Sequence, residues 1–390
     1  MKLAQRMAGI AMESAFDVLA RARALEAQGR NIIHLEIGEP DFNTPAHIVA
    51  AAKLALDEGW THYNSPQGYP ELREAVSRYV LRTRGINVGS QHVSIVPGAK
   101  PVLFFPMLAL IESGDEVLYP DPGFPIYRSL INFVGAKPVP IPLREGRGFS
   151  LDLDFVRDHI TDRTKLIILN SPHNPTGGVI PETDIRELAS IILDRDLMVL
   201  SDEIYMKICY DDAGAFSIAS VPGMPEKTIL MDGLSKSYAM TGWRLGFGIM
   251  PEWLVMAVNK LMANSNTCTA SFTQRAAIAA LDGPQIEIDN MVAEFRTRRD
   301  VFCQALNSIP GISCSVPKGA FYAFANVQGT GLTSREVADL LLERACVACL
   351  DGGGFGECGQ GYVRLSYANS LDNLNEAARR IRETSTVWAK

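Results

Sequence analysis

The sequence lacks an apolar run long enough to cross a membrane. A spanning helix needs about 20 apolar residues, and the longest candidate, Pro101–Ile111, is shorter and predicts a buried helix. The apolar stretch near the N-terminus, residues 8–12, is short and ends at Glu13, so no signal peptide is predicted. With 47% hydrophobic and 21% charged residues, the composition is typical of a soluble globular protein.

An excess of positive charge and a regular cysteine spacing are also missing. The net charge is −7 and no long basic run occurs, which disfavours nucleic acid as a partner. The seven cysteines are scattered, as is typical of reduced thiols in a cytoplasmic protein. Cys346 and Cys349 form a C-x-x-C pair near Cys358, but no histidine follows to complete a zinc site. We therefore expect buried apolar thiols, no metal and no membrane partner.

Two nucleotide-binding patterns are absent. The G-x-x-x-x-G-K-[ST] spacing of a P-loop does not occur, and no G-x-G-x-x-G motif follows a predicted strand. A nicotinamide-dependent dehydrogenase is therefore disfavoured. Internal repeats and low-complexity segments are also missing.

From residue 93 onward, short apolar strands alternate with helical stretches. Strands are predicted at residues 92–96, 116–119, 166–169, 197–200, 228–231 and 245–249. Continuous apolar strands joined by helices predict an α/β fold with a mainly parallel sheet covered on both faces. Polar residues follow the strand ends, which is where open α/β sheets bind ligands.

The length predicts two domains. We expect residues 1–40 to form an N-terminal arm and part of a small domain, 41–284 a large domain, and 285–390 a small C-terminal α+β domain. Thr44 is expected to cap a helix that has Pro45 at its first position. Further predicted elements are a helix before Gly29, strands at 32–37, 312–316, 320–325 and 361–365, and helices at 332–343 and 371–384.

The stretch from Asp232 to Gly246 follows a predicted strand and contains one lysine, Lys236, beside Ser235, with Arg244 eight positions on. A lysine amine is nucleophilic only when neutral, which requires burial or a cationic neighbour. A lysine that can form a Schiff base, next to a hydroxyl and a guanidinium that can hold a phosphate, suggests pyridoxal phosphate. The alternative is a solvated lysine and a surface arginine.

Polar residues near other strand ends suggest parts of the same site. Ala99 and Lys100 follow Gly98 between a strand and a helix, where backbone N–H groups can face an anion; an ordinary turn is the alternative. Asp202 ends a buried strand and needs a cationic partner such as a pyridinium nitrogen, although it could also be a helix N-cap.

Further candidates could contact the ring of such a cofactor. Tyr205 and Asn174 can bind a ring phenolate, and Phe124 can stack on the ring. Gly38 permits close approach of the backbone to a ligand, unless it forms only a turn. Tyr63 could reach a ligand, unless it is an exposed loop tyrosine.

Together these motifs resemble class I/II pyridoxal-phosphate aminotransferases of fold type I, which include aspartate aminotransferase. The lysine motif from Ser235 to Gly246 carries the resemblance most strongly. The other matching motifs follow in the family's order: Tyr63-x-x-x-x-Gly68-x-x-x-Leu72-Arg73, Gly98-x-Lys100, Asn174-Pro-Thr-Gly177, Asp202-Glu-x-Tyr205 and Tyr362-Val-Arg-Leu-Ser366. The resemblance implies a seven-stranded-type, mainly parallel sheet flanked by helices, with the cofactor in the large domain.

The resemblance also implies roles at the cofactor ring. Lys236 would form the Schiff base and then move the proton between Cα and C4′ of the adduct. Asp202 would pair with the pyridine nitrogen. Asn174 and Tyr205 would bind the ring oxygen, and Phe124 would stack on the ring.

For the charged ends of cofactor and substrate, the resemblance implies two anion sites. The phosphate would be held by Ser235, Arg244 and the backbone amides of Ala99 and Lys100, with the Lys100 side chain pointing away. Tyr63 would reach the phosphate of the neighbouring subunit, which requires a homodimer. The substrate α-carboxylate would be held by a bidentate Arg364, helped by Asn174 and the Gly38 amide.

The predicted function is therefore an aminotransferase that moves an amino group from an L-amino acid to a 2-oxo acid by a ping-pong route. A C–S β-lyase on the same fold is the first alternative. A binding module that has lost the chemistry is the second, and the intact Lys236 argues against it. The loop Leu350–Gly356 lacks the family's usual Pro-Gly pair, which leaves the substrate open. No cation for a distal substrate carboxylate is assigned, and Ile37, Phe321 and Tyr322 would suit apolar substrates.

Overall fold

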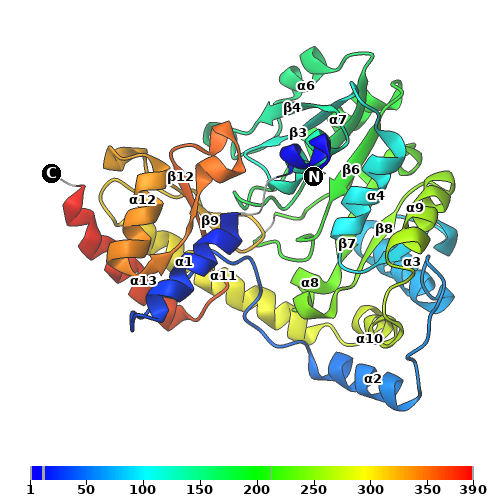
Figure 1. Cartoon of the computed structure of the whole chain (residues 1–390), viewed down its shortest axis with the longest axis horizontal. Helices are drawn as coiled ribbons and strands as arrows, with labels where there is room; N and C mark the ends of the chain where they lie inside the picture. The colour runs from blue at the N-terminus through cyan, green and yellow to red at the C-terminus, as the bar shows by residue number, and fades with distance from the viewer. Residues whose placement is uncertain (1, 11–13, 212, 389–390) are drawn as a thin grey trace.

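The larger part of the molecule is built on a seven-stranded sheet in the order β2-β8-β7-β6-β5-β3-β4, which lies on the right in Figure 1. The computed structural model describes residues 2–10, 14–211 and 213–388. Strand β8 runs antiparallel to β2 and β7, and every other neighbouring pair is parallel. The strands are β2 (Val93–Val96), β3 (Glu116–Asp121), β4 (Lys137–Pro142), β5 (Thr164–Asn170), β6 (Met198–Asp202), β7 (Thr228–Gly233) and β8 (Gly246–Ile249). The predicted mainly parallel sheet is confirmed.

Both faces of this sheet are buried, as its continuous apolar strands predict. In β5, Leu166 and Ile168 belong to one core cluster, and Ile167 and Leu169 belong to another. Successive side chains of a strand point to opposite faces, so each cluster covers one face. The first cluster includes α4 (Lys100–Leu110), α5 (Ile126–Phe133) and α9 (Glu252–Ser265), and the second includes α6 (Leu153–His159) and α7 (Glu182–Leu193). Helices α2 (Ala46–Asp57), α3 (Pro70–Arg84) and α10 (Ser271–Asp282) cover the β2–β8 edge.

A smaller part of the molecule is built on separate strands. Strand β12 (Tyr362–Ser366) pairs antiparallel with β11 (Leu350–Asp351) and β9 (Tyr322–Asn326). The other elements are β1 (Ile33–His34), which pairs parallel with β10 (Val347–Ala348), and helices α1 (Ser14–Glu26), α11 (Ile286–Asn307), α12 (Ser334–Leu340) and α13 (Leu371–Thr384). Figure 1 shows α1, in blue, beside the orange and red C-terminal helices. The N-terminal segment thus joins the C-terminal part, while the exact domain boundaries stay a prediction.

Several local predictions were wrong. Helix α2 begins at Ala46 with Pro45 as its N-cap, whereas the Thr44 hydroxyl donates to the backbone oxygen of Ala239 at 2.7 Å. Of the strand predicted at 312–316, only Ser313 pairs, in an isolated bridge. Strand β4 was missed because its sequence, Lys-Pro-Val-Pro-Ile-Pro, is rich in proline, which argues against a strand. The strand lies at the edge of the sheet, where proline is tolerated.

Neither a membrane span nor a metal cluster is found in the described part of the chain. None of the helices there is both long and apolar enough to cross a bilayer. Likewise, no three His, Cys, Asp or Glu side chains among residues 2–10, 14–211 and 213–388 gather as metal ligands would.

A buried ion cluster fixes α3 against the sheet. Arg84, the last residue of α3, donates from Nε to Glu203 Oε2 at 2.6 Å and from Nη2 to Asp232 Oδ2 at 2.5 Å. The side chains of all three residues are almost fully buried. Removing one member of such a cluster leaves buried charges without compensation.

We predict that Arg84→Met lowers the free energy of unfolding by about 3–5 kcal/mol, because two carboxylates lose their buried cation. Arg78→Met is a matched control on the same helix, since Arg78 pairs with Asp282 at the surface and should contribute less than about 1 kcal/mol. Thermal unfolding followed by circular dichroism measures both. Equal destabilisation by the two substitutions would contradict the assigned role of the cluster.

Candidate active site

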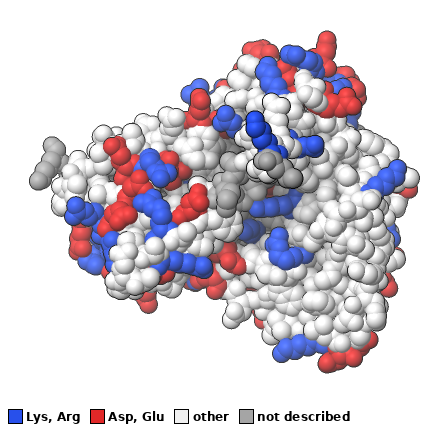
Figure 2. Space-filling model, viewed as in Figure 1, with Lys and Arg blue, Asp and Glu red and all other residues white. Residues whose placement is uncertain are grey.

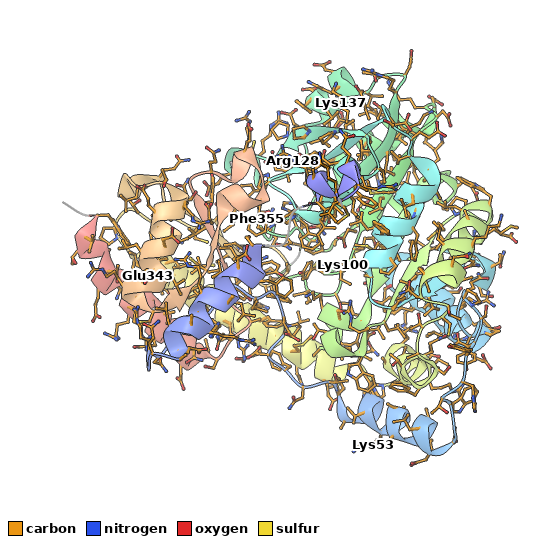
Figure 3. The ribbon with its side chains drawn as sticks, viewed as in Figure 1. Lys53, Lys100, Arg128, Lys137, Glu343 and Phe355 are labelled. Atoms are coloured by element: carbon orange, nitrogen blue, oxygen red, sulfur yellow. The ribbon has the colours of Figure 1, made fainter. Side chains whose placement is uncertain are left out.

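A cavity of about 380 Å³ lies between the large sheet and the smaller part of the molecule. Its walls include the ends of β5, β6 and β7 and the start of α4, as expected for an open α/β sheet. Figure 2 shows the surface hollowed between the two parts, with lysine and arginine side chains beside the hollow. In Figure 3, Lys100 lies toward the large sheet and Phe355 toward β9 and β12. The cavity lining contains every site residue predicted from the sequence except Tyr63, namely Gly38, Ala99, Lys100, Phe124, Asn174, Asp202, Tyr205, Ser235, Lys236, Arg244 and Arg364.

Lys236 enters the cavity from the short helix α8 (Leu234–Ser237), which directly follows β7. Its Nζ donates to the backbone oxygen of Gly38 at 2.5 Å and lies 6.0 Å from the centroid of the Phe321 ring. A Cβ atom on Gly38 would come within 2.2 Å of the Tyr322 hydroxyl. Position 38 therefore requires glycine for its carbonyl to reach the lysine.

Asp202 is buried at the carboxyl end of β6. Its Oδ2 accepts from the Tyr127 hydroxyl at 2.6 Å, and its Oδ1 accepts from the Ile204 amide at 3.2 Å. Burial raises the pKa of Asp202 to about 7, because desolvation disfavours the carboxylate. No salt bridge joins Asp202 to a cation among residues 2–10, 14–211 and 213–388. A pyridinium N–H is the kind of partner that this carboxyl group lacks.

Arg364 is a buried cation on β12. It donates from Nη1 to Asn174 Oδ1 at 3.0 Å and from Nη2 to the backbone oxygen of Glu36 at 2.6 Å. Its buried Nε has no hydrogen-bond partner in the described chain. Nor does any carboxylate of that part of the chain form an ion pair with it. A buried guanidinium with neutral partners is suited to receive a ligand carboxylate in its bidentate fork.

Tyr205 and Tyr322 form a pair on the cavity wall. Their hydroxyl oxygens are 2.6 Å apart, and both residues are buried. Burial raises the pKa of Tyr205 well above its ordinary value, so its phenol stays protonated and can donate. The ring of Phe124 meets the Tyr127 ring edge-on, with centroids 5.7 Å apart.

The start of α4 and Arg244 form an anion site. Arg244 has a left-handed backbone and donates from Nη1 to the Thr241 oxygen at 2.8 Å. A Cβ atom on Gly98 would lie 2.2 Å from Arg244 Nη2, so the guanidinium lies directly against this glycine. Similarly, a Cβ atom on Gly246 would lie 2.6 Å from Ala99 Cα. These close approaches bring a guanidinium and the N-terminus of an 11-residue helix together, an arrangement that favours a phosphate.

Lys100 differs from expectation, and Tyr63 lies outside the cavity. The Lys100 side chain does not point away from the site: it lines the cavity, with Nζ 5.5 Å from the Phe124 ring centroid. Tyr63 is 86% exposed and belongs to a separate hollow that Trp60 and Phe272 also line. Its role at a neighbouring subunit stays a prediction.

Sequence reasoning missed some residues of the cavity. Tyr127 carried no signal, because a tyrosine on a predicted helix gives no indication that it contacts Asp202. Asn170 could have been found, since it ends β5 and begins the loop that contains Asn174. Its Nδ2 donates to the Asp202 backbone oxygen at 3.0 Å, and its Oδ1 accepts from the Asn174 amide at 2.9 Å.

The residues present fit pyridoxal phosphate. Lys236 offers an amine, Asp202 a buried carboxyl group that lacks a cation, and Tyr205 a phenolic donor. Phe124 offers an aromatic face, and Arg244 with the start of α4 offers a phosphate site. Each feature matches one functional group of the cofactor, which leaves the buried Arg364 for a substrate carboxylate.

Comparisons with known proteins agree with this donor set. A family model described as "Aminotransferase class I and II" matches residues 30–381. The chain is 41% identical to an aspartate aminotransferase from Pyrococcus horikoshii, covering 97% of this chain and 96% of that protein. It is 41% identical to aromatic-amino-acid aminotransferase 2 from Thermococcus litoralis, covering 91% and 92%. The solved aspartate aminotransferase from Rhizobium meliloti superposes with a TM-score of 0.95 at 34% identity, covering 99% of each chain.

We predict that Asp202 makes the cofactor-free protein less stable as the pH rises. Between the unfolded pKa near 3.9 and the folded pKa of about 7, the unfolded chain releases a proton that the folded chain retains. Unfolding is therefore favoured as the pH rises through this window, by a few kcal/mol in total. The melting temperature should be lower at pH 7.5 than at pH 5, and this difference should be larger for the wild-type protein than for the Asp202→Asn variant. The same pH dependence in both proteins would contradict the buried, uncompensated state of Asp202.

Proposed function

Because this chain belongs to the class I and II aminotransferases, we propose that it uses pyridoxal phosphate to transfer the amino group of an L-amino acid to a 2-oxo acid. The observation that carries this proposal is the meeting of Lys236, Asp202 and the buried Arg364 in one cavity. The relatives described above are aminotransferases, which favours transamination over the C–S β-lyase alternative.

Each of these side chains has a separate role in the reaction. When bound, pyridoxal phosphate supplies an aldehyde for the substrate amine and a ring that withdraws electrons from the substrate Cα. Asp202 would hold the proton on the ring nitrogen, and Tyr205 would donate to the ring oxygen. The Lys236 amine takes the proton from the substrate Cα. Arg364 fixes the substrate carboxylate so that this Cα faces the lysine.

The same carboxylate site at Arg364 can bind the substrates of both half-reactions. The amino donor and the oxo acceptor each carry an α-carboxylate, so Arg364 and Asn174 can hold them in turn. This accounts for a ping-pong route, in which the first product leaves before the second substrate binds in the same place.

We further propose that the donor has an acidic side chain, with aspartate as the first candidate. Lys100 adds a cation to the cavity wall in addition to Arg364, and several relatives are named aspartate aminotransferases. Apolar side chains also line the cavity, including Phe16, Leu350 and Phe355, so aromatic donors are the natural comparison. A preference for phenylalanine that Lys100→Met leaves unchanged would contradict this assignment.

We also propose a cytoplasmic homodimer with shared active sites. All seven cysteines are unpaired thiols, which suits a reducing compartment. Recovery of the protein in an exported fraction would contradict the location. The exposed Tyr63 would contribute to the cavity of the second subunit.

We expect purified protein with added pyridoxal phosphate to absorb at roughly 360–430 nm, because the cofactor joins the Lys236 amine. Lys236→Ala should lose this band, whereas Lys53→Ala, an exposed lysine on α2, should keep it. Borohydride reduction followed by peptide mapping should place the cofactor on Lys236. A wild-type protein that stays colourless would refute the proposed cofactor.

Single L-amino acids added to the same protein without an oxo acid then identify the reaction. Transamination should shift the band toward about 330 nm, first with aspartate if the donor is acidic. An unshifted band with accumulating pyruvate and ammonia would instead show a lyase. Lys236→Ala serves as the inactive control in each titration.

For the shared site, we predict that mixing two weakened proteins restores activity. Tyr63→Phe should weaken cofactor binding about tenfold, through loss of a hydrogen bond to a charged group, and Lys236→Ala should be inactive. A hybrid dimer of the two has one site with both residues intact, provided that Tyr63 acts across the interface. Activity at low cofactor concentration after refolding the mixture measures this. No recovery, or a monomer by sedimentation, would contradict the proposal.

A further inference from the structure

The glycine loop, residues 352–359, joins β11 to the segment that leads into β12 and closes tightly on itself. A Cβ atom on Gly352 would lie 2.2 Å from the Gly359 oxygen, and one on Gly359 would lie 2.1 Å from the Gly352 oxygen. The two ends of the loop are therefore in backbone contact, which only glycine permits. A loop closed in this way can hold the side chain at its tip, Phe355, in one place.

Asp121 of the large sheet binds the glycine loop from outside. This residue ends β3 and is buried, and its two carboxylate oxygens accept from the Glu357 amide at 3.2 Å and the Cys358 amide at 3.0 Å. The Gly123 amide adds a third link by donating to the Phe355 oxygen at 2.8 Å. Gly356 has φ +135°, and a Cβ atom there would lie 2.2 Å from Asp121 Oδ1. The loop backbone is thus fitted to this carboxylate.

Phe355 connects the glycine loop with the cavity. Its side chain lines the cavity and is buried, and its ring centroid lies 5.1 Å from Arg364 Cζ. The ring of Tyr322 lies 4.4 Å from the same atom. Arg364 therefore has two aromatic contacts, and stacking of this kind fixes the plane of a guanidinium.

We infer that Asp121 is a positioning residue for substrate binding: through the glycine loop and Phe355, it sets the orientation of the Arg364 guanidinium. Asp121 touches neither substrate nor cofactor in this role. A bidentate carboxylate contact depends on the angle of the guanidinium plane, so a displaced Phe355 weakens substrate binding. The inference rests on the proposed function, because that function assigns the substrate carboxylate to Arg364.

The first test is Asp121→Asn, which keeps the size of the side chain and replaces one of its two acceptor oxygens by an NH₂ group. We expect KM for both the amino acid and the oxo acid to rise about tenfold, with kcat within about threefold of wild type. The dissociation constant for succinate, a carboxylate that cannot react, should rise by a similar factor of about ten in calorimetric titration. The visible cofactor band should not change.

Asp152→Asn is the matched control. Asp152 also accepts a backbone N–H, from Phe155 at 3.2 Å at the start of α6, and it does not line the cavity. This variant should leave KM and succinate binding unchanged. Should Asp121→Asn fail to fold, Gly356→Ala tests the same contact, because its Cβ atom would displace the loop from Asp121.

A double variant separates positioning from simple support of the fold. Phe355→Leu should raise KM as Asp121→Asn does, and the combination should raise KM no further, since both act on Arg364 through the same contact. Additive effects, or a lowered melting temperature with KM and succinate binding unchanged, would overturn the inference while the wild-type protein stays active. A wild-type protein without transaminase activity would instead overturn the proposed function.

Discussion

Two ionisable groups, the carboxyl group of Asp202 and the guanidinium of Arg364, are buried in one cavity without a counter-ion from the described chain. Burial of this kind costs free energy unless a partner arrives, and the pKa of Asp202, raised to about 7, is one sign of that cost. A cationic ring nitrogen would satisfy the first group and a substrate carboxylate the second. The architecture around the cavity can be understood as support for these two positions.

Arg84 is a buried cation that, unlike Arg364, has counter-ions in the described chain. Arg84 is as deeply buried as Arg364, but two carboxylates lie within 2.6 Å of its nitrogen atoms. Asp202 and Glu203 are neighbours in sequence, yet Glu203 has this ion pair and further hydrogen bonds from Ser201 and Ser217. One strand end thus carries a carboxylate with a cationic partner and a carboxylate that has only neutral hydrogen-bond donors. The ion-paired Glu203 stabilises the fold, and Asp202 is suited to receive a cationic group of a ligand.

Sequence reasoning found the groups that follow strands and could not find those that act through packing. Lys236, Asp202 and Asn174 stand at the ends of apolar strands, so the parallel sheet alone predicts that they meet. The sequence shows no periodicity that would place Tyr127 against Asp202 or Phe355 against Arg364. Those contacts depend on helix and loop positions that are set by the whole tertiary structure. The Lys100 side chain was misplaced for the same reason, because a backbone role in a βα turn does not determine where a long side chain lies.

The cavity also depends on segments that lie far apart in the sequence. Gly38 comes from the segment after β1, Lys236 follows a strand of the large sheet, and Arg364 lies in the smaller sheet. These residues are far apart in the sequence, but hydrogen bonds join Lys236 to Gly38 and Arg364 to the neighbouring Glu36. No local segment can form such a site, and it exists only when both sheets are in place. A cofactor and substrate of the proposed kind would compensate groups that the folded chain alone leaves without a counter-ion, so their binding free energy would add to the stability of the whole fold. The groups that make the cavity costly to form are therefore the same groups that give it its affinity.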